Sequence, residues 1–403
     1  MKKICVVTAT RAEYGLLRNT IRRIETDPEL ELCLVVTGSH LSEDYGYTVR
    51  EIEQDGFPIE AEIQILESGV GQLPIVKTMA NALQQFGETF AQFCPDLLLV
   101  LGDRYELLAI CEAALMLKIP IAHISGGEIT EGVVDDVVRH CITKMRHLHF
   151  PGCEVYSQRI IQLGEQPDSV FNYGDVGVEN IRKMDFADRK ELEDFMAFPL
   201  DWPYACVTFH PTTLGAQSSE KQLLELLGAI ESFGDMKFIF TGSNADAGGE
   251  SLNQMIQQFV MEHENCRYYA SLGIRRYLRL LKDSEMIIGN SSSGIVEAPC
   301  FGIPTVNIGD RQKGRLQADS VINCDPVKNR IIGAVKRART EEFKHRAKTA
   351  VNPYGSGDTS EGIVREIKRF LKSDKNLMKK FYDLPVGKNV KKGVCNARNT
   401  EGK

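Results

Sequence analysis

The sequence predicts an α/β protein made of two Rossmann-like domains, each a doubly wound parallel sheet, which face each other across a cleft. Short, continuous apolar runs alternate with helical segments, as is typical of strands that are buried on both faces. The alternation begins at residue 4 and starts again near residue 175, and 403 residues are enough for two domains. We expect a first domain over 1–172 and a second over 173–360. A C-terminal helix assigned to 361–385 should complete the first domain, before a disordered tail over 387–403.

The strands of the first domain are expected where apolar and β-branched residues follow one another. In a parallel sheet with right-handed crossovers, the turns after the strands gather at one edge, where such folds bind ligands. Arg11 and Arg104 lie in two of these turns and are candidate phosphate ligands, although surface arginines are common. The expected strands are 4–8, 32–37, 59–66, 96–101, 120–124, one around 147–149, and 170–173, with a helix over 107–117.

Carboxylates also gather in these turns. Asp103 follows the fourth expected strand, and Glu128, Asp135 and Asp136 follow the fifth. Like charges in one site raise one another's pKa, which suits proton transfer near neutral pH. The alternatives are structural: Asp103 as a helix N-cap, and the adjacent aspartates as acids that begin a helix and pair with Arg139 one turn on. We favour the structural interpretation for Asp136 and the catalytic one for Asp103 and Asp135.

The second domain repeats the pattern. Its first strand ends in His210, which at this place can donate to a phosphate or move a proton, or can merely fill the turn. The turn after the next strand is rich in small polar residues and includes Asn244. Strands are expected at 204–209, 237–240, 286–288, 305–308 and 320–323, and helices at 274–281, 327–339 and 361–371.

The stretch from residue 286 to residue 315 organises the expected binding site. A strand ends in Gly289 and Asn290, and three serines from Ser291 onward then begin an apolar helix. The unpaired N–H groups and the dipole of a helix start bind anions, and glycine lets the backbone approach a ligand. One strand later, Arg311 adds a forked donor. An ordinary capped helix is the alternative, which the nearby basic turn makes less favoured.

Composition excludes several classes of protein. A net charge of −7 argues against nucleic-acid binding. Eleven scattered cysteines without a C-x-x-C pair fit the reduced thiols of a cytoplasmic protein, and no metal-ligand spacing is found. The first apolar run is too short for a signal peptide, and no run is long enough to span a membrane. No G-x-G-x-x-G follows the first strand, so a nucleoside diphosphate sugar is expected in the cleft rather than a dinucleotide.

Seven motifs occur in order along the chain to about residue 386: TATRAEYG, GSHL, LGDR, GGE with the following DD and RH, FHPTT, IGNSSSG and NIGDRQKGR. Together they resemble the hydrolysing UDP-N-acetylglucosamine 2-epimerases. That family serves bacterial pathways to sialic and legionaminic acids and forms the epimerase half of an animal bifunctional enzyme. The resemblance implies a glycosyltransferase-B-like fold with a hinge that closes on substrate, and no cofactor. We also expect a homo-oligomer, a dimer or a tetramer.

The resemblance also implies a reaction. UDP is eliminated across C1 and C2 of the sugar to give a 2-acetamidoglucal, and water then adds to release free N-acetylmannosamine. Charge develops on the leaving β-phosphate, where helix-start N–H groups, an arginine and a cationic His210 would stabilise it. Removal of the weakly acidic C2 proton requires a carboxylate that is held close and aligned, and a second carboxylate can return a proton to C2.

Site residues are carried over motif by motif. Asp103 and Asp135 match the acidic catalytic residues, His210 matches the histidine near the diphosphate, and Glu128 is a further catalytic candidate. The candidate substrate- and UDP-binding residues are Arg11, Arg104, Asn244, Gly289, Asn290, Ser291, Ser292, Glu297 and Arg311; no residue is assigned to a metal.

One residue departs from the family pattern. The residue before the paired glycines is a catalytic glutamate in the animal enzyme and some bacterial relatives, but here it is Ser125, and one extra residue near Glu131 follows. A serine cannot act as a carboxylate base. Either Glu128 or Glu131 takes that role, or the substrate differs. UDP-2,4-diacetamido-2,4,6-trideoxyglucose, which leads toward legionaminic acid, is the natural second candidate.

Three other functions are compatible with this fold. A non-hydrolysing epimerase would add UDP back and release an epimerised nucleotide sugar. A glycosyltransferase would require an acceptor. A nucleotide-sugar sensor would have no turnover, but the carboxylates of the first domain argue against it, because they contribute nothing to the binding of a dianion.

Overall fold

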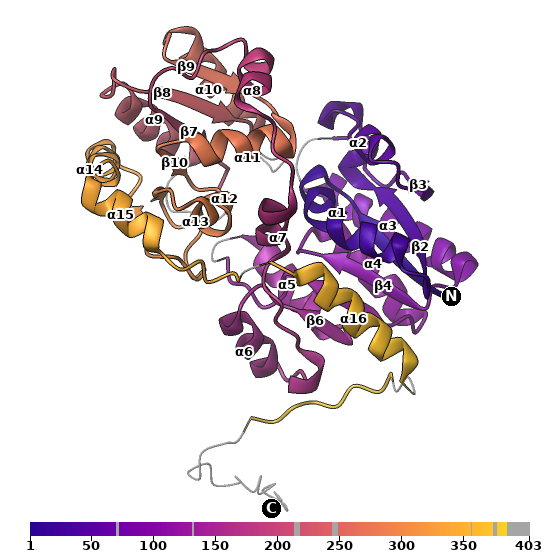
Figure 1. The fold of residues 1–403 in the computed structure, drawn as a ribbon. Coiled ribbons are helices and arrows are strands. Elements are labelled where there is room, and N and C mark those ends of the chain that lie inside the picture. The colour runs from indigo at the N-terminus through magenta and orange to yellow at the C-terminus, as the bar shows by residue number, and fades with distance from the viewer. Residues whose placement is uncertain are drawn as a thin grey trace, which may run out of the picture.

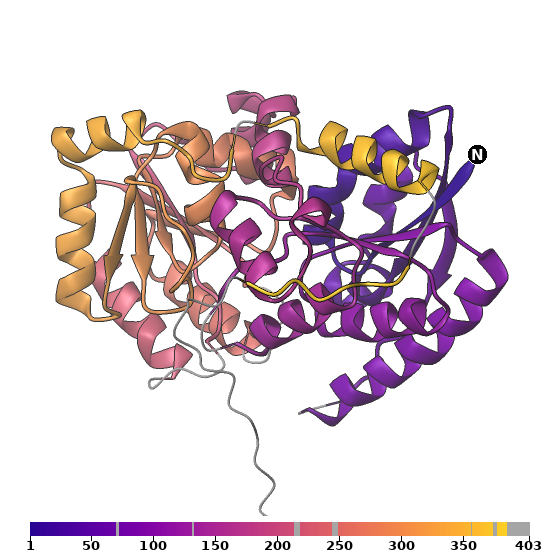
Figure 2. The ribbon, with the colours of Figure 1, turned by 90° about the horizontal axis from the view of Figure 1, so that it is seen from below.

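A computed structural model describes residues 1–69, 72–130, 133–212, 218–243, 249–355, 357–373 and 377–384 of the chain. The strands of these residues form two six-stranded sheets in which every named pair is parallel. Helices cover both faces of each sheet, and the two sheets form separate lobes (Figures 1 and 2). This confirms the predicted pair of doubly wound α/β domains.

The first sheet has the strand order β3-β2-β1-β4-β5-β6. The order reverses between β1 and β4, so the turns after these two neighbours flank one crevice at the carboxyl edge. The strands are β1 (Lys2–Thr8), β2 (Leu30–Thr37), β3 (Ile59–Ile63), β4 (Leu97–Leu101), β5 (Ile121–Ile124) and β6 (Leu148–Phe150). The helices are α1 (Arg11–Thr26), α2 (Val49–Gln54), α3 (Leu73–Phe93), α4 (Tyr105–Met116), α5 (Val134–Lys144) and α6 (Glu154–Gln162), with short 3-10 turns at η1 (Gly38–Leu41), η2 (Glu43–Tyr45) and η3 (Pro167–Ser169).

The second sheet has the order β12-β11-β10-β7-β8-β9, which is the same winding, and its order reverses between β7 and β10. Its strands are β7 (Tyr204–Thr208), β8 (Lys237–Thr241), β9 (Cys266–Tyr269), β10 (Met286–Gly289), β11 (Thr305–Ile308) and β12 (Val321–Cys324). Its helices are α8 (Arg189–Met196), α9 (Ser219–Ile230), α10 (Gly249–Met261), α11 (Gly273–Asp283), α12 (Ser293–Val296), α13 (Ala298–Phe301), α14 (Lys328–Ala338) and α15 (Glu341–Thr349).

Each sheet is buried on both faces. Alternate residues of the central strands enter separate apolar cores on the two sides of a sheet, which explains why these strands read as continuous apolar runs. The last helix, α16 (Thr359–Lys372), follows the second domain but packs on α1, and its Ile363, Val364, Ile367 and Leu371 complete a core of the first domain (Figure 2).

Three expectations about local structure are wrong. The assigned helix over 361–385 ends at Lys372, because Ser373 is extended and residues 377–384 form no helix. The expected strand at 170–173 is reduced to one bridge between His149 and Val170. The apolar helix expected after Ser291 is two four-residue pieces, α12 and α13, because Pro299 begins a new turn and cannot donate a helical N–H.

The chain passes between the lobes at two places that touch each other. Helix α7 (Val176–Lys183), which precedes the entry of the chain into the second lobe at α8, packs on α1 and α16 of the first lobe. The backbone N–H of Asp175 donates to the carbonyl of Tyr354 at 2.9 Å. Gly174 is in the left-handed region at φ 89°, and a Cβ there would lie 2.9 Å from the Tyr354 carbonyl oxygen. These two segments therefore form a compact joint in which a larger residue at 174 does not fit.

Ten of the eleven cysteines lie in the described ranges. All ten of their cysteines are free thiols, and none of their helices has the length and apolar character needed to cross a membrane. In the same ranges, no three His, Cys, Asp or Glu side chains are grouped as metal ligands would be.

Candidate active site

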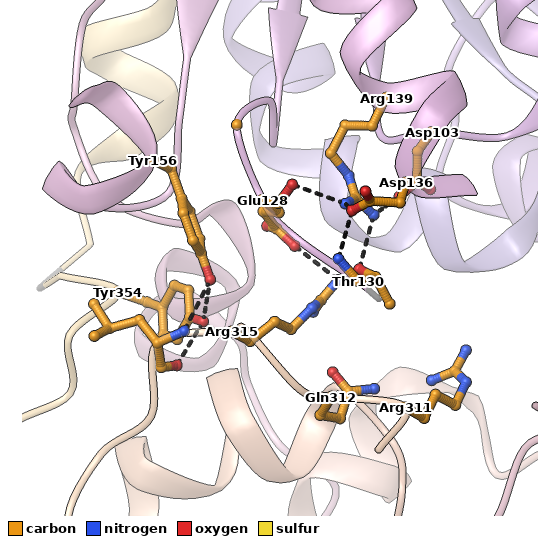
Figure 3. Close-up of polar contacts among 12 residues, drawn as sticks. Asp103, Glu128, Thr130, Asp136, Arg139, Tyr156, Arg311, Gln312, Arg315 and Tyr354 are labelled. Carbon is orange, nitrogen blue, oxygen red and sulfur yellow. Dashed lines mark hydrogen bonds and ion pairs between the residues drawn. The ribbon is translucent and has the colours of Figure 1, made fainter. Parts of the chain in front are cut away.

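The carboxyl edges of the two sheets face each other, and ion pairs and hydrogen bonds join them. Arg315, beyond β11, reaches Glu128, beyond β5, with 2.7 Å between Nη2 and Oε2 (Figure 3). Arg11, at the start of α1, donates to the hydroxyl of Ser271 after β9. The turn after β5 and the basic turn after β11, both singled out from the sequence, therefore meet at this boundary.

Arg139 on α5 organises the acids of the first domain (Figure 3). Its side chain is only 2% exposed and forms an ion pair with Asp103. Its Nη1 also donates to the carbonyl of Glu128 at 3.1 Å, and its Nη2 donates to the hydroxyl of Thr130 at 3.2 Å. Asp103 is not the N-cap of α4, since that position is Arg104 and carries no capping bond. The buried guanidinium instead holds Asp103 at the edge of the sheet, with a quarter of its side chain accessible.

The adjacent aspartates of α5 have different surroundings. Asp136 accepts a hydrogen bond from the Thr130 N–H at 2.6 Å and pairs with Arg139 at 3.4 Å, as the structural interpretation predicted. Asp135 lies in the first turn of α5 and is partly exposed. The structure therefore gives Asp136 a role in fixing the turn before α5 and leaves Asp135 at the surface of the site.

Glu128 is buried at the boundary between the lobes. Its carboxylate faces Arg315, and the arginine is itself largely buried. Beside this ion pair, the hydroxyl groups of Tyr156 and Tyr354 are 2.8 Å apart, and the N–H of Leu316 donates to Tyr156 at 3.3 Å (Figure 3). In this arrangement the carboxylate of Glu128 is compensated by a cation from the opposite domain.

Ser125, which the sequence analysis placed at the position of the family glutamate, follows β5 directly and has φ at 66°. A non-glycine residue in the left-handed region carries backbone strain, and such positions are concentrated at functional sites. Ser125 is partly exposed, whereas Gly126 and Gly127 behind it are buried. Glu131, the other candidate substitute for the missing carboxylate, lies outside the described residues.

In the second domain, His210 and Asn290 fix the two turns at the switch point. The N–H of His210 donates to the Asn290 side-chain oxygen at 2.7 Å, and the Asn290 amide returns a bond to the His210 carbonyl at 2.9 Å. Gly289 has φ at 136°, and a Cβ there would lie 1.9 Å from the Thr208 carbonyl oxygen. Only glycine fits this position, so the turn from β10 can lie directly against β7.

The basic turn after β11 completes this part of the site. Arg311 Nη1 and Gln312 Nε2 both donate to the Asn290 carbonyl, at 3.2 and 2.9 Å. Burial, and then the charge of Arg311, hold the pKa of His210 well below its usual range. The low pKa favours a neutral imidazole in the unliganded protein, so the cationic His210 that the resemblance implies stays a prediction for the protein with a bound diphosphate.

The remaining predicted residues of the second domain are dispersed. Ser291 and Ser292 are partly or fully exposed, and Ser291 Oγ accepts the N–H of Ser293 at 3.3 Å. Glu297 accepts a bond from the Ser293 hydroxyl, and burial raises the pKa of this carboxyl group. Asn244 lies outside the described residues. The serine turn is thus directed to solvent, while Glu297 lies behind it.

Arg104 follows Asp103 and is held by an ion pair with Glu106, with 3.2 Å between Nε and Oε1.

Sequence reasoning missed several other residues of this region. Arg139 had been expected to pair only with the acids of its own helix, and Arg315, Gln312, Tyr156 and Tyr354 had no assigned role. The signal for Arg315 was present in NIGDRQKGR, but which basic residue of that motif crosses to the first domain depends on the relative position of the lobes.

The chain is similar to known proteins over most of its length. The family profile described as UDP-N-acetylglucosamine 2-epimerase matches residues 22–368. The GDP/UDP-N,N'-diacetylbacillosamine 2-epimerase (hydrolyzing) of Campylobacter jejuni is 39% identical, across 95% of this chain and 99% of its own. Polysialic acid biosynthesis protein P7 of Escherichia coli is 42% identical, across 96% of this chain and 98% of its own.

The fold is also similar to solved structures. The complex of S. aureus MnaA with UDP superposes with a TM-score of 0.79 at 19% identity, over 95% of this chain and 100% of the other. At this identity the likeness concerns the fold alone, and it confirms the predicted glycosyltransferase-B-like arrangement of two domains.

Proposed function

The chain belongs to the UDP-N-acetylglucosamine 2-epimerase family, and we propose that it is a hydrolysing UDP-sugar 2-epimerase whose site lies between the two sheets. The observation that carries this proposal is the Glu128–Arg315 ion pair, which joins the turn after β5 to the turn after β11, at the edges where the acids of the first domain and the polar turns of the second domain lie. An acidic set on one side and a polar, cationic set on the other suit a sugar bound through a diphosphate. No cofactor is needed for this chemistry.

In this proposal the second domain holds UDP. The N–H groups around Ser291 and Ser292 face the diphosphate, together with Arg311 and His210. Support comes from the hydrogen bonds that join Asn290 to His210 and Arg311, because they fix these groups before the ligand arrives. Asn244 and Glu297 are assigned to the same half of the substrate. A bound diphosphate raises the pKa of the neutral His210, so the imidazole becomes cationic where the leaving group develops charge.

The first domain acts on the hexose. One carboxylate, from Asp103 or Asp135, removes the C2 proton while the C1–O bond breaks and its electron pair leaves with UDP. The C1–C2 double bond of the 2-acetamidoglucal is formed in this step. Water then adds its oxygen to C1 and releases one proton to the medium, and the other carboxylate gives a proton to C2 from the opposite face. Arg11 and Arg104 are assigned to the substrate phosphates, and Arg139 keeps Asp103 in position.

The identity of the sugar in the UDP-sugar substrate is the more specific part of the proposal. Glu128 is paired with Arg315, so it replaces the missing family glutamate as a base only when that ion pair opens. We propose that Ser125 makes room for, or bonds to, a modified C4 or C6 substituent, as in UDP-2,4-diacetamido-2,4,6-trideoxyglucose. The similarity to a diacetylbacillosamine 2-epimerase supports this choice, whereas the similarity to a polysialic acid biosynthesis protein supports UDP-N-acetylglucosamine.

The cellular setting is part of the proposal. Free thiols throughout the described residues support a cytoplasmic enzyme of the sialic- or legionaminic-acid type pathway. Exposed apolar side chains on α3 and α4 support a dimer or tetramer built on this face; they are Leu73, Val76, Leu83, Leu115 and Met116.

The test is an incubation with each of the two UDP-sugars, with kcat/KM measured for both and the products resolved by NMR. Free UDP and a reducing sugar support hydrolysis. An epimerised UDP-sugar would show a non-hydrolysing enzyme, and a requirement for an acceptor would show a transferase. A clear preference for UDP-N-acetylglucosamine would contradict the role given to Ser125.

A further inference from the structure

An extended segment beyond α16, residues 377–384, lies on the first lobe (Figure 2). We call it the C-terminal strap. Backbone groups near its two ends are bonded to that lobe. The carbonyl of Leu377 accepts from His147 Nε2, just before β6, at 3.4 Å. The N–H of Tyr382 donates to the carbonyl of Gly164, after α6, at 2.9 Å. The strap therefore spans from the start of β6 to the turn after α6.

Between these two bonds, Lys379 of the strap reaches a buried carboxylate. Glu165 is only 2% exposed, and its Oε2 lies 2.7 Å from Lys379 Nζ and 3.0 Å from His149 Nε2. Its Oε1 lies 2.6 Å from Lys144 Nζ. Burial lowers the pKa of His149 to about 4, so this imidazole is neutral at pH 7. The negative charge of Glu165 is therefore compensated by two lysines, one from α5 and one from the strap.

Lys379 also caps the C-terminus of α5. Its Nζ donates to the carbonyl of Lys144, the last residue of that helix, at 2.8 Å. The last carbonyls of a helix have no partner within the helix and form the negative end of its dipole, so a cation placed there is favourable. One ammonium group thus joins the end of α5 to the turn after α6.

The side chains around Lys379 pack the strap against the same two elements. The ring of Phe381 lies over Gly164, where a Cβ would come within 2.4 Å of it. Lys144 Nζ lies 5.0 Å from the centre of this ring, and the Gln166 side chain donates to the carbonyl of Lys380 at 3.2 Å. The turn after α6 is thus shaped to receive the strap.

Both of the joined helices reach the acidic half of the site from their other ends. The first turn of α5 carries Asp135, and Arg139 farther along the same helix holds Asp103. From α6, Arg159 Nη1 donates to the carbonyl of Gly127, in the turn after β5, at 2.5 Å. A change in the position of α5 relative to α6 would therefore move the acids relative to the turn that carries Glu128.

We propose that the C-terminal strap is a positioning element of the active site, and that Lys379 is the residue through which it keeps α5 in a fixed position beside α6. Lys379 contacts no reacting group and acts through α5, whose Arg139 orients Asp103. The effect on turnover rests on the proposed function, whereas the hold on α5 does not. The UDP half of the site, assigned to the second domain, is outside the reach of the strap.

Lys379→Met tests this role, because it keeps the length of the side chain and removes its charge and its donors. The kcat should fall about tenfold, since a small displacement of an aligned acid is costly. The Kd for UDP should stay within about twofold, since distant sites act independently. Lys379→Arg keeps a cation with several donors and should restore most of kcat. Lys380→Met is the matched control and should behave as wild type, because Lys380 is exposed and joins the lobe through its backbone carbonyl.

Hydrogen–deuterium exchange followed by mass spectrometry gives a readout that needs no turnover. In Lys379→Met the amides of α5 should exchange faster than in wild type, and those of the second domain, such as α11, should be unchanged. Lys379→Arg and Lys380→Met should exchange α5 at close to the wild-type rate. This pattern separates a local hold on α5 from a general loss of stability, which would speed exchange in both lobes.

Unchanged exchange of α5 in Lys379→Met would overturn the proposal, whatever the activity. Faster exchange in both lobes alike, or faster exchange of α5 with kcat unchanged, would overturn the positioning role as well. If wild type proved inactive on both UDP-sugars while exchange in Lys379→Met was faster in α5 alone, the hold on α5 would stand and the proposed function alone would fail.

Discussion

The carboxylate of Glu128 and the guanidinium of Arg315 lie 2.7 Å apart across the boundary between the two lobes. Both side chains are largely withdrawn from solvent, so each charge depends on the other for compensation. Tyr156, Tyr354 and Leu316 form hydrogen bonds immediately beside them and connect the same two lobes. We therefore interpret the ion pair as a contact that holds the two lobes together in this arrangement.

A double-mutant cycle on Glu128→Gln and Arg315→Met tests whether this ion pair acts as a unit. If the pair acts as a unit, each single variant leaves a buried charge unpaired and lowers kcat/KM, and the double variant recovers part of the loss, with a coupling energy of roughly 1–3 kcal/mol. A base role for Glu128 predicts a different result, in which Glu128→Gln loses turnover and Arg315→Met does not rescue it. Steady-state kinetics of the four proteins distinguishes the two outcomes.

Arg139 is predicted to control the position of Asp103. Arg139→Ala should destabilise the protein by about 3–5 kcal/mol, because it removes one partner of a buried ion pair. Arg139→Lys keeps the charge but not the fork that reaches Asp103, Thr130 and the Glu128 carbonyl, so kcat should fall with little change in the affinity for UDP. Arg279→Lys, in the ion pair with Asp283 on α11, is the control and should change neither value.

Asp103→Asn should abolish turnover while UDP still binds.

UDP binding is predicted to depend on pH through His210. The imidazole is neutral in the free protein and gains a proton when the diphosphate binds, so the affinity should rise as the pH falls toward the usual pKa of histidine. Calorimetry in buffers of different ionisation enthalpy measures this proton uptake. His210→Ala should bind UDP more weakly, react more slowly and take up less proton. Equal uptake by wild type and His210→Ala would contradict the assignment.

Stability is predicted to depend on pH through Asp175, the N-cap of α7 at the joint between the lobes. Burial, and then the charge on Glu128, raise the pKa of Asp175 from its ordinary 3.8 to about 7. The folded protein keeps a proton that the unfolded chain releases in this interval, so the free energy of unfolding falls as the pH rises from 3.8 to about 7.

Asp175→Asn removes this dependence, because an amide can still accept the Gly177 N–H that Asp175 binds at 2.7 Å. We compare the free energy of unfolding of the variant with that of wild type. This difference should shift in favour of the variant by a few kcal/mol between pH 4 and pH 7. Urea unfolding at several pH values measures the difference. Asp188→Asn, at an exposed N-cap on α8, is the control. If the free energy of unfolding of Asp175→Asn changed with pH in parallel with that of wild type, the prediction would be wrong.

Sequence reasoning found the fold and many of the turns because these depend on local patterns. The apolar run of β4 indicates a buried strand and Gly289 at the end of β10 indicates a close backbone approach, and the winding rules then place the turns at one edge. Asp136 and Arg139 could be paired for the same reason, since their spacing on one helix brings them together.

Contacts between distant segments were not accessible in this way. The ion pair of Arg139 with Asp103 depends on how α5 packs beside β4, and that of Arg315 with Glu128 depends on the relative position of the lobes. The neutral state of His210 follows from burial that no sequence pattern reports. The break between α12 and α13 was foreseeable from Pro299, but the apolar residues on both sides concealed it.

The most direct test of the account is to follow the reaction with UDP-N-acetylglucosamine and with the 2,4-diacetamido-trideoxy sugar in deuterated water by NMR. Because the account removes the C2 proton and returns one from the medium, it predicts free UDP and a reducing sugar of inverted C2 configuration that carries deuterium at C2. Release of UDP with the original C2 hydrogen and configuration retained would show simple hydrolysis at C1 and would contradict it.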